Sequence, residues 1–123
     1  MANPNLLSAT TISGITTFLE LTTSSQTLVS NAAASGKVMR IGGVTVANID
    51  GTNAADVTVK IHNAAAGAGT SFSLFQTVSV PGDSSITLVD KNNVVYVGES
   101  QSFTAEASAD SDLNIIVSYE EIS

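Results

Sequence analysis

The side chains that could perform chemistry in this 123-residue chain are few and scattered. His62 is the only histidine, and a general base or a histidine-based zinc site needs partner groups that the sequence does not place beside it. Its place on the polar side of an alternating segment, next to a loop, predicts a surface residue. Cysteine is absent, so neither a disulfide nor a thiolate metal site can form.

Acidic residues offer the next possible chemistry. Residues 48–53 and 110–112 place Asp and Asn oxygens at alternate positions, but neither segment has the ligand spacing of an EF-hand loop. Asp and Asn in turns bind their own backbone, which explains both segments, and calcium binding stays open as a minor alternative. A carboxylate pair for glycoside hydrolysis is a further alternative, although the chain lacks Trp and the aromatic platforms of a sugar cleft.

Motifs for covalent catalysis and phosphate binding are missing. The sequence GESQS at 98–102 lacks the closing glycine of a nucleophile elbow, and GAG at 67–69 lacks the third glycine of a dinucleotide loop. We therefore predict no catalytic, cofactor-binding or metal-binding residue, and a protein that is not an enzyme.

The elements that would position any site are strands. Apolar and polar residues alternate with period two and β-branched residues are frequent, whereas helical periodicity is hard to find. Strands are expected at residues 15–21, 27–30, 38–49, 56–62, 71–80, 84–89, 94–97, 102–108 and 113–120, with a short edge strand at 10–13. Short strands at this spacing predict an all-β, single-domain antiparallel β-sandwich or jelly roll of about eight strands.

Within this sandwich, local sequence predicts several details. Gly42-Gly43 inside a long strand indicates a bulge or bend. Residues 30–37 and 63–70 are expected to be loops of small residues. The four phenylalanines, Phe18, Phe72, Phe75 and Phe103, fall on strands and are expected in the core.

The first residues lack this alternation. We expect an extended N-terminal arm at 1–9, followed by the sandwich domain at 10–123. A frayed terminus and a tether to a neighbouring subunit both fit such an arm. In the second case Asn3, Pro4, Leu6 and Leu7 are the predicted protein-interface residues.

Charge restricts the partners. Net charge is −7 with only four Lys and Arg, so no basic surface for nucleic acid is expected.

No secretory signal or membrane-spanning apolar stretch is visible, and we expect no membrane partner. Only 12% of residues are charged, and a surface of small neutral side chains favours wide contact with identical neighbours. After residue 91 all charged residues are acidic, which leaves open a solvated acidic face or one that meets a basic partner.

Several stretches together carry a resemblance. These are MANPN at 1–5, NIDGTNAADVTV at 48–59, the turn from VP at 80–81 to DKN at 90–92, and SYEEIS at 118–123. With them the chain resembles small β-rich structural proteins of marine tailed phages, especially cyanophages. The resemblance implies a virion component present in many copies, assembled in the host cytoplasm, without a cofactor.

We consider three alternative functions for this protein. The first is a capsid decoration (cement) protein that binds the major capsid protein or other virion proteins and stabilises the lattice, as a homo-oligomer for which a trimer is one arrangement. The alternative is a tail, collar or fibre component with a host-facing loop at 63–70. The third is an enzyme acting on host polysaccharide.

Overall fold

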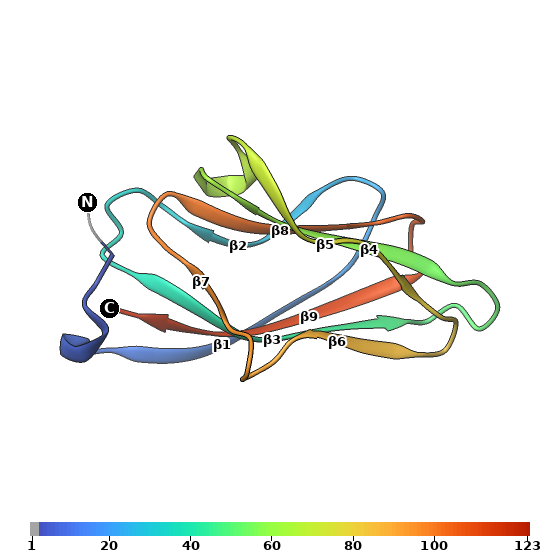
Figure 1. Cartoon of the computed structure of the whole chain (residues 1–123), viewed down its shortest axis with the longest axis horizontal. Coiled ribbons are helices and arrows are strands. Elements are labelled where there is room, and N and C mark those ends of the chain that lie inside the picture. The colour runs from blue at the N-terminus through green and yellow to red at the C-terminus, as the bar shows by residue number, and fades with distance from the viewer. Residues whose placement is uncertain (1–2) are drawn as a thin grey trace.

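The computed structural model describes residues 3–123 as two packed antiparallel sheets with nine strands (Figure 1). Sheet A has the order β1-β9-β3-β6, and β7 also pairs with β3. Its strands are β1 (Ile12–Glu20), β9 (Leu113–Ile122), β3 (Val38–Asn48), β6 (Ser85–Val89) and β7 (Val95–Val97). Sheet B has the order β2-β8-β4-β5, with β2 (Gln26–Asn31), β8 (Gln101–Ala107), β4 (Ala55–His62) and β5 (Ser71–Val80). The predicted β-sandwich is confirmed, and its nine strands overlap the nine longer segments expected to be strands.

The core lies between the sheets and consists of the inward side of the alternating pattern. In β9, Leu113, Ile115 and Val117 are fully buried while Ile116 between them is exposed. Valine and isoleucine dominate because β-branched side chains pack well on a pleated sheet. The largest fully buried side chains are Phe103, Leu21, Ile41, Leu113, Ile115, Val44, Val46, Val57, Val59, Val80, Val89 and Val97.

The predicted irregularity in the long strand is confirmed. The pairing of β3 with β9 shifts register between Ile41 and Gly43. Before the shift the odd-numbered Met39 and Ile41 face the core, and after it the even-numbered Val44 and Val46 do. The extra residue therefore lets one strand keep its apolar side inward across two strand partners, β7 and then β6.

Two predictions about strands and phenylalanines need correction. Residues 10–13 do not form a separate edge strand, because β1 begins at Ile12 and continues without a break to Glu20. Only Phe103 is fully buried, and Phe75 packs partly against the core. Phe18 is 73% exposed because its position in β1 points away from the opposite sheet. Phe72 is 57% exposed although its partner Ile61 lies on the inward side of sheet B beside buried Phe103, because Phe72 lies near the start of the edge strand β5.

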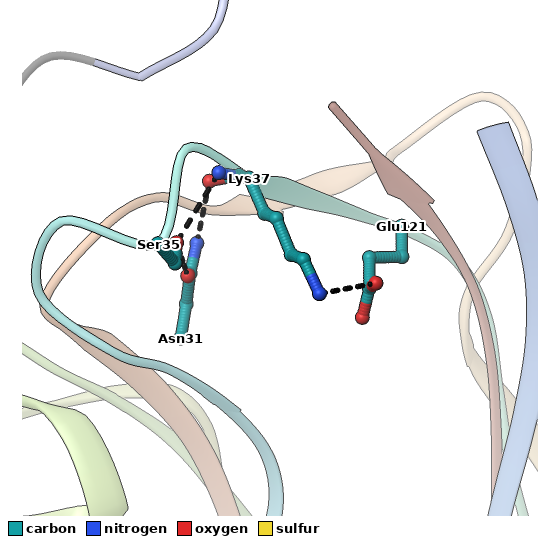
Figure 2. A network of polar contacts seen from close by, with 4 residues as sticks. All are labelled: Asn31, Ser35, Lys37 and Glu121. Carbon is teal, nitrogen blue, oxygen red and sulfur yellow. Dashed lines mark hydrogen bonds and ion pairs between the residues drawn. The ribbon is translucent and has the colours of Figure 1, made fainter. Parts of the chain in front are cut away.

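One end of the sandwich is closed by a buried polar side chain. Asn31, fully buried at the end of β2, donates from Nδ2 to the carbonyl oxygens of Lys37 (2.8 Å) and Val97 (3.1 Å). Its Oδ1 accepts from the hydroxyl of Ser35, and Lys37 Nζ lies 2.9 Å from Glu121 Oε1 (Figure 2). These contacts fix the loop that follows β2 and join both sheets near the C-terminus (Figure 1). The loop is non-helical as predicted, but it begins after Asn31 and not at residue 30.

Candidate functional site

His62 is buried, and its predicted surface position is wrong. The side chain is 8% exposed, and its ring lies between Thr104 Oγ1, 2.8 Å from Nε2, and the carbonyl oxygen of Ala68, 3.2 Å from Nδ1. Because a carbonyl can only accept, Nδ1 donates to the Ala68 carbonyl oxygen, and Nε2 shares a hydrogen bond with the Thr104 hydroxyl. Both ring nitrogens are thus occupied in holding a loop, which assigns His62 a structural role.

The loop at 63–70 explains this burial, because it folds back over the outer face of sheet B. It contains a short 3-10 turn, η2 (Ala65–Gly67), seen above β2 and β8 in Figure 1. Ser102 Oγ donates to Ala64 O (2.7 Å) and accepts from Gly67 N (2.9 Å), while Ser30 Oγ accepts from Ala66 N (2.8 Å). The loop was correctly predicted, but the serines that anchor it from β2 and β8 come from distant parts of the sequence.

The carboxylates in the turns accept hydrogen bonds from backbone N–H groups. Asp50 accepts from the backbone N–H groups of Thr52 (2.8 Å) and Asn53 (3.3 Å), which lower its pKa below the ordinary value of 3.8. Asp110 likewise accepts from Thr23 N (2.8 Å). Within residues 3–123 no three His, Cys, Asp or Glu side chains converge as metal ligands, and no helix is long and apolar enough to cross a membrane.

The acidic residues of the C-terminal third do not form one face. Glu106 in β8 pairs with Lys60 at 3.3 Å on sheet B, and Glu120 in β9 pairs with Arg40 at 2.9 Å on sheet A. Glu99 accepts from Gly36 N at the end of the sandwich. Because these side chains are distributed over both sheets and several are paired with cations, a single acidic docking face is not supported.

The predicted interface residues lie in a segment that folds against its own domain. Asn3 Oδ1 accepts from Glu99 N (2.7 Å), and Pro4 and Leu6 line a shallow hollow with Val38 and Tyr96. A Cβ on Gly98 would lie 2.6 Å from Asn3 Nδ2, so a larger residue there would displace the Asn3 side chain. The segment therefore has a defined docking place on the sandwich.

The N-terminal segment covers part of the sandwich and contains a short turn. Val38 and its register partner Ile122 are 4% and 6% exposed although they lie outside the main core cluster, which agrees with cover from the segment. Leu6 begins the 3-10 turn η1 (Leu6–Ser8), which Asn5 caps by accepting from Leu7 N (3.0 Å). Leu7 is 98% exposed. Whether these residues contact another protein, and whether the chain divides at residue 9, stay predictions; Met1 and Ala2 lie outside the described residues.

The outer face of sheet A carries exposed large apolar side chains. Phe18 in β1 and Ile116 in β9 are register partners and are 73% and 45% exposed. Beside them is a hollow where several residues lack large side chains. It is lined by Gly14, Ile15, Thr16, Arg40, Gly42, Gly43, Ser118, Tyr119 and Glu120.

The sequence contained a signal for this surface. In 113–120 Ile116 breaks the polar side of the alternation, and in 15–21 Phe18 falls among the outward even-numbered positions. Sequence alone did not show that these two residues are neighbours, because they belong to the first and last strands.

Comparison with known proteins identifies solved structures with a similar fold. No family model matches the sequence, and no curated protein is similar to it. A chain from the acidic stable capsid structure of Helicobacter pylori bacteriophage KHP30 has a TM-score of 0.54 at 9% identity, covering 94% of this chain and 90% of that chain. A chain from Bacillus endospore appendages, described as disulfide-linked pili, has a TM-score of 0.54 at 12% identity, covering 92% and 87%. These likenesses show a shared fold.

Proposed function

We propose that the protein is a non-enzymatic structural component of a phage particle, and that it acts as a capsid decoration protein. The observation that carries the proposal is the outer face of sheet A, where the exposed Phe18 and Ile116 lie beside a hollow formed by small residues. Such a surface suits contact with protein, because small neutral side chains cost little entropy and little desolvation when they are covered.

The strand order adds support. With β6 and β7 taken as one interrupted strand, the two sheets read β1-β9-β3-β6/β7 and β2-β8-β4-β5, the double-sheet arrangement of jelly rolls. Jelly rolls recur in viral capsid proteins but also in lectins and cupins, so the fold alone does not select a function. The fold of the KHP30 capsid chain favours the virion among these, and the cyanophage resemblance belongs to the same proposal.

The proposed mechanism is stabilisation by binding. A protein that binds the assembled capsid lattice, and not its dissociated subunits, shifts the equilibrium toward the lattice in proportion to its concentration over Kd. The partner in this mechanism is the major capsid protein. Leu7 is the proposed contact of the N-terminal segment, since it projects at 98% exposure from a turn whose neighbours are fixed to the sandwich.

A second candidate is a subunit of a fibre, collar or tail. The pilus neighbour favours it, because the same fold there builds a filament. The present chain has no cysteine, so it would have to form such a filament without the disulfide links described for that protein.

Binding to isolated assemblies tests the proposal. Purified protein is mixed with capsids lacking it and with isolated tails, and bound protein is measured after sedimentation. Decoration predicts saturable binding to capsids and delayed capsid disruption on heating. Binding to tails alone would favour the second candidate, and turnover of host polysaccharide would restore the enzyme hypothesis.

A matched pair of variants tests the contact. Leu7→Ser should weaken capsid binding and leave the melting temperature unchanged, because the side chain is almost wholly exposed. Leu74→Ser, an exposed leucine of β5 on the other sheet, serves as the control and should bind like the wild type. Equal binding by both variants would remove Leu7 from the proposed interface.

A further inference from the structure

The four sheet edges of the sandwich differ in regularity. The edge strands β2, β5 and β6 each contain at least one register shift against their inner neighbour, and β6 and β7 share one edge in two short pieces. In contrast, β1 pairs with β9 from Ile12 to Glu20 without a shift. Bulges and short strands are the usual means by which edges avoid further pairing. Of the edges described, β1 alone is long and uninterrupted.

The backbone groups on the free side of β1 can be assigned from its bonds to β9. Thr11 and Ser123 exchange both backbone hydrogen bonds, and Leu21 N donates to Leu113 O. Antiparallel strands alternate bonded and non-bonded positions, so odd-numbered residues of β1 bond to β9. The N–H and C=O groups of Ile12, Gly14, Thr16, Phe18 and Glu20 therefore point outward from the edge of the sheet.

Side chains do not protect this edge either. The strand contains neither proline nor lysine, and its one charged residue, Glu20, stands at the end. The N-terminal segment turns away from the edge, since Asn3 bonds to Glu99 beyond β7. A nine-residue edge in this state is a template for another strand.

We infer that β1 pairs antiparallel with β1 of a second copy of this chain, about a twofold axis at Thr16. In this register Thr16 faces Thr16 of the second copy, Phe18 faces Gly14, and Glu20 faces Ile12. Every outward N–H and C=O of the strand then has a partner, which shifted registers do not achieve. Sheet A becomes continuous across the two copies.

The side chains fit this register. All five residues lie on the outer face of sheet A, so Phe18 of one copy extends over Gly14 and the adjoining hollow of the other. An aromatic side chain opposite an edge glycine is a favourable cross-strand pair, as is threonine opposite threonine.

Charge does not oppose a second copy as the occupant. Although each chain carries −7, the paired segments contribute only Glu20 from each copy. The two glutamates are eight residues apart along the paired strands, about 26 Å at the rise of a β-strand. This exceeds the screening length of about 8 Å at physiological salt, so like-charge repulsion across the edge is small. The inference does not depend on where in a virion, or in which assembly, the protein acts.

The oligomeric state and a matched pair of lysine variants test the pairing. Wild-type protein should sediment as a dimer in analytical ultracentrifugation. Thr16→Lys places two lysines directly opposite each other at the axis, with Cα atoms about 5.5 Å apart, and this like-charge pair should raise the dimer Kd about tenfold or more. Thr87→Lys makes the same change on the same face of sheet A, at the opposite edge strand β6, and should stay dimeric. A wild type that is monomeric or trimeric, or a dimeric Thr16→Lys variant whose Kd equals that of Thr87→Lys, would overturn the inference.

Single cysteines test the register, because the chain has no native thiol. Bonded antiparallel partners have Cα atoms about 5.5 Å apart, which is within disulfide reach. Under mild oxidation Thr16→Cys should form a covalent dimer, whereas Gly14→Cys, Phe18→Cys and Thr87→Cys should not. Cross-linking through residue 14 or 18 in place of 16 would contradict the proposed axis. Circular dichroism and melting temperature confirm that each variant is folded.

Discussion

Replacing Asn31 with aspartate removes one buried donor group without changing the size of the side chain. In the wild type, Nδ2 of this fully buried residue donates to the carbonyl oxygens of Lys37 and Val97, so it joins the end of β2 to the residue before β3 and to the end of β7. The carboxylate can only accept when ionised, and it would face two acceptors. The contact from the Ser35 hydroxyl to Oδ1 can remain, because that oxygen is an acceptor in both residues.

The expected loss of stability follows from the two carbonyls left without a donor. Each buried unsatisfied group costs about 1–3 kcal/mol, and since the Lys37 carbonyl is only partly buried we expect a total of about 2–4 kcal/mol. For 123 residues the entropy of unfolding is about 0.26 kcal/mol/K, so the melting temperature should fall by about 8–16 °C.

The loss should depend on pH. Burial and the two carbonyl oxygens disfavour the charged form, so the pKa of the introduced carboxyl is raised in the folded state above its unfolded value of about 3.9. Stability relative to wild type is therefore best below the unfolded pKa and declines as pH rises through the folded pKa. Unfolding by urea at pH 4 and pH 7 measures this difference.

Asn93→Asp makes the same chemical change at an exposed turn residue and should alter stability by less than about 0.5 kcal/mol. If Asn31→Asp melted within about 4 °C of this control at pH 7, the assignment of Asn31 as the link between the strands would be refuted.

Three further predictions concern the core, the loop and a turn. Phe103→Ala should destabilise the protein by about 3–5 kcal/mol in urea unfolding, whereas Phe18→Ala should leave the monomer nearly unchanged, because Phe103 is fully buried and Phe18 is 73% exposed. Gly67→Ala should increase amide hydrogen exchange in the 63–70 loop, because Gly67 has φ +71° and the new Cβ would lie 2.9 Å from Thr27 Oγ1. Ala66→Gly, at φ 58°, should instead be neutral or stabilising. Faster exchange in Ala66→Gly than in Gly67→Ala would contradict this account. Asp50 should titrate below pH 3.8 by NMR. Because its pKa is lowered in the folded state, its stabilising contribution is present above the unfolded pKa and disappears as pH falls through the folded pKa. Asp50→Asn should abolish that part of the dependence of stability on acid pH.

Most strands could be predicted because their signal is local. Residues 71–80 were predicted with the observed bounds, and the bulge at Gly42-Gly43 followed from glycines within a continuous apolar alternation. The phenylalanines show where this reasoning fails. Phe18 and Phe103 both lie on strands, and which side of a strand is buried depends on the sheet that packs against it.

The candidate surfaces depended on the same long-range information. The predicted arm residues could be named from the missing alternation, but their docking on Glu99, Val38 and Tyr96 joins residues far apart in the sequence. His62 was expected at the surface because its own strand gave no sign that the 63–70 loop returns over it.

The sequence by itself determined that the chain is all-β, has two-sided strands with one apolar side, contains no thiol, and carries few charges, because these properties follow from residue type and period-two spacing. Tertiary structure decided the strand order, and with it the neighbours across strands and the edges left open. Phe18, Ile116 and the glycine hollow become one surface only when β1 and β9 pair, and β1 becomes a free edge only when no other strand of the chain takes the place beside it. These contacts bring together the first and last strands of the chain. They arise from hydrogen bonding between strands, and no local sequence pattern identifies which strand will be the partner.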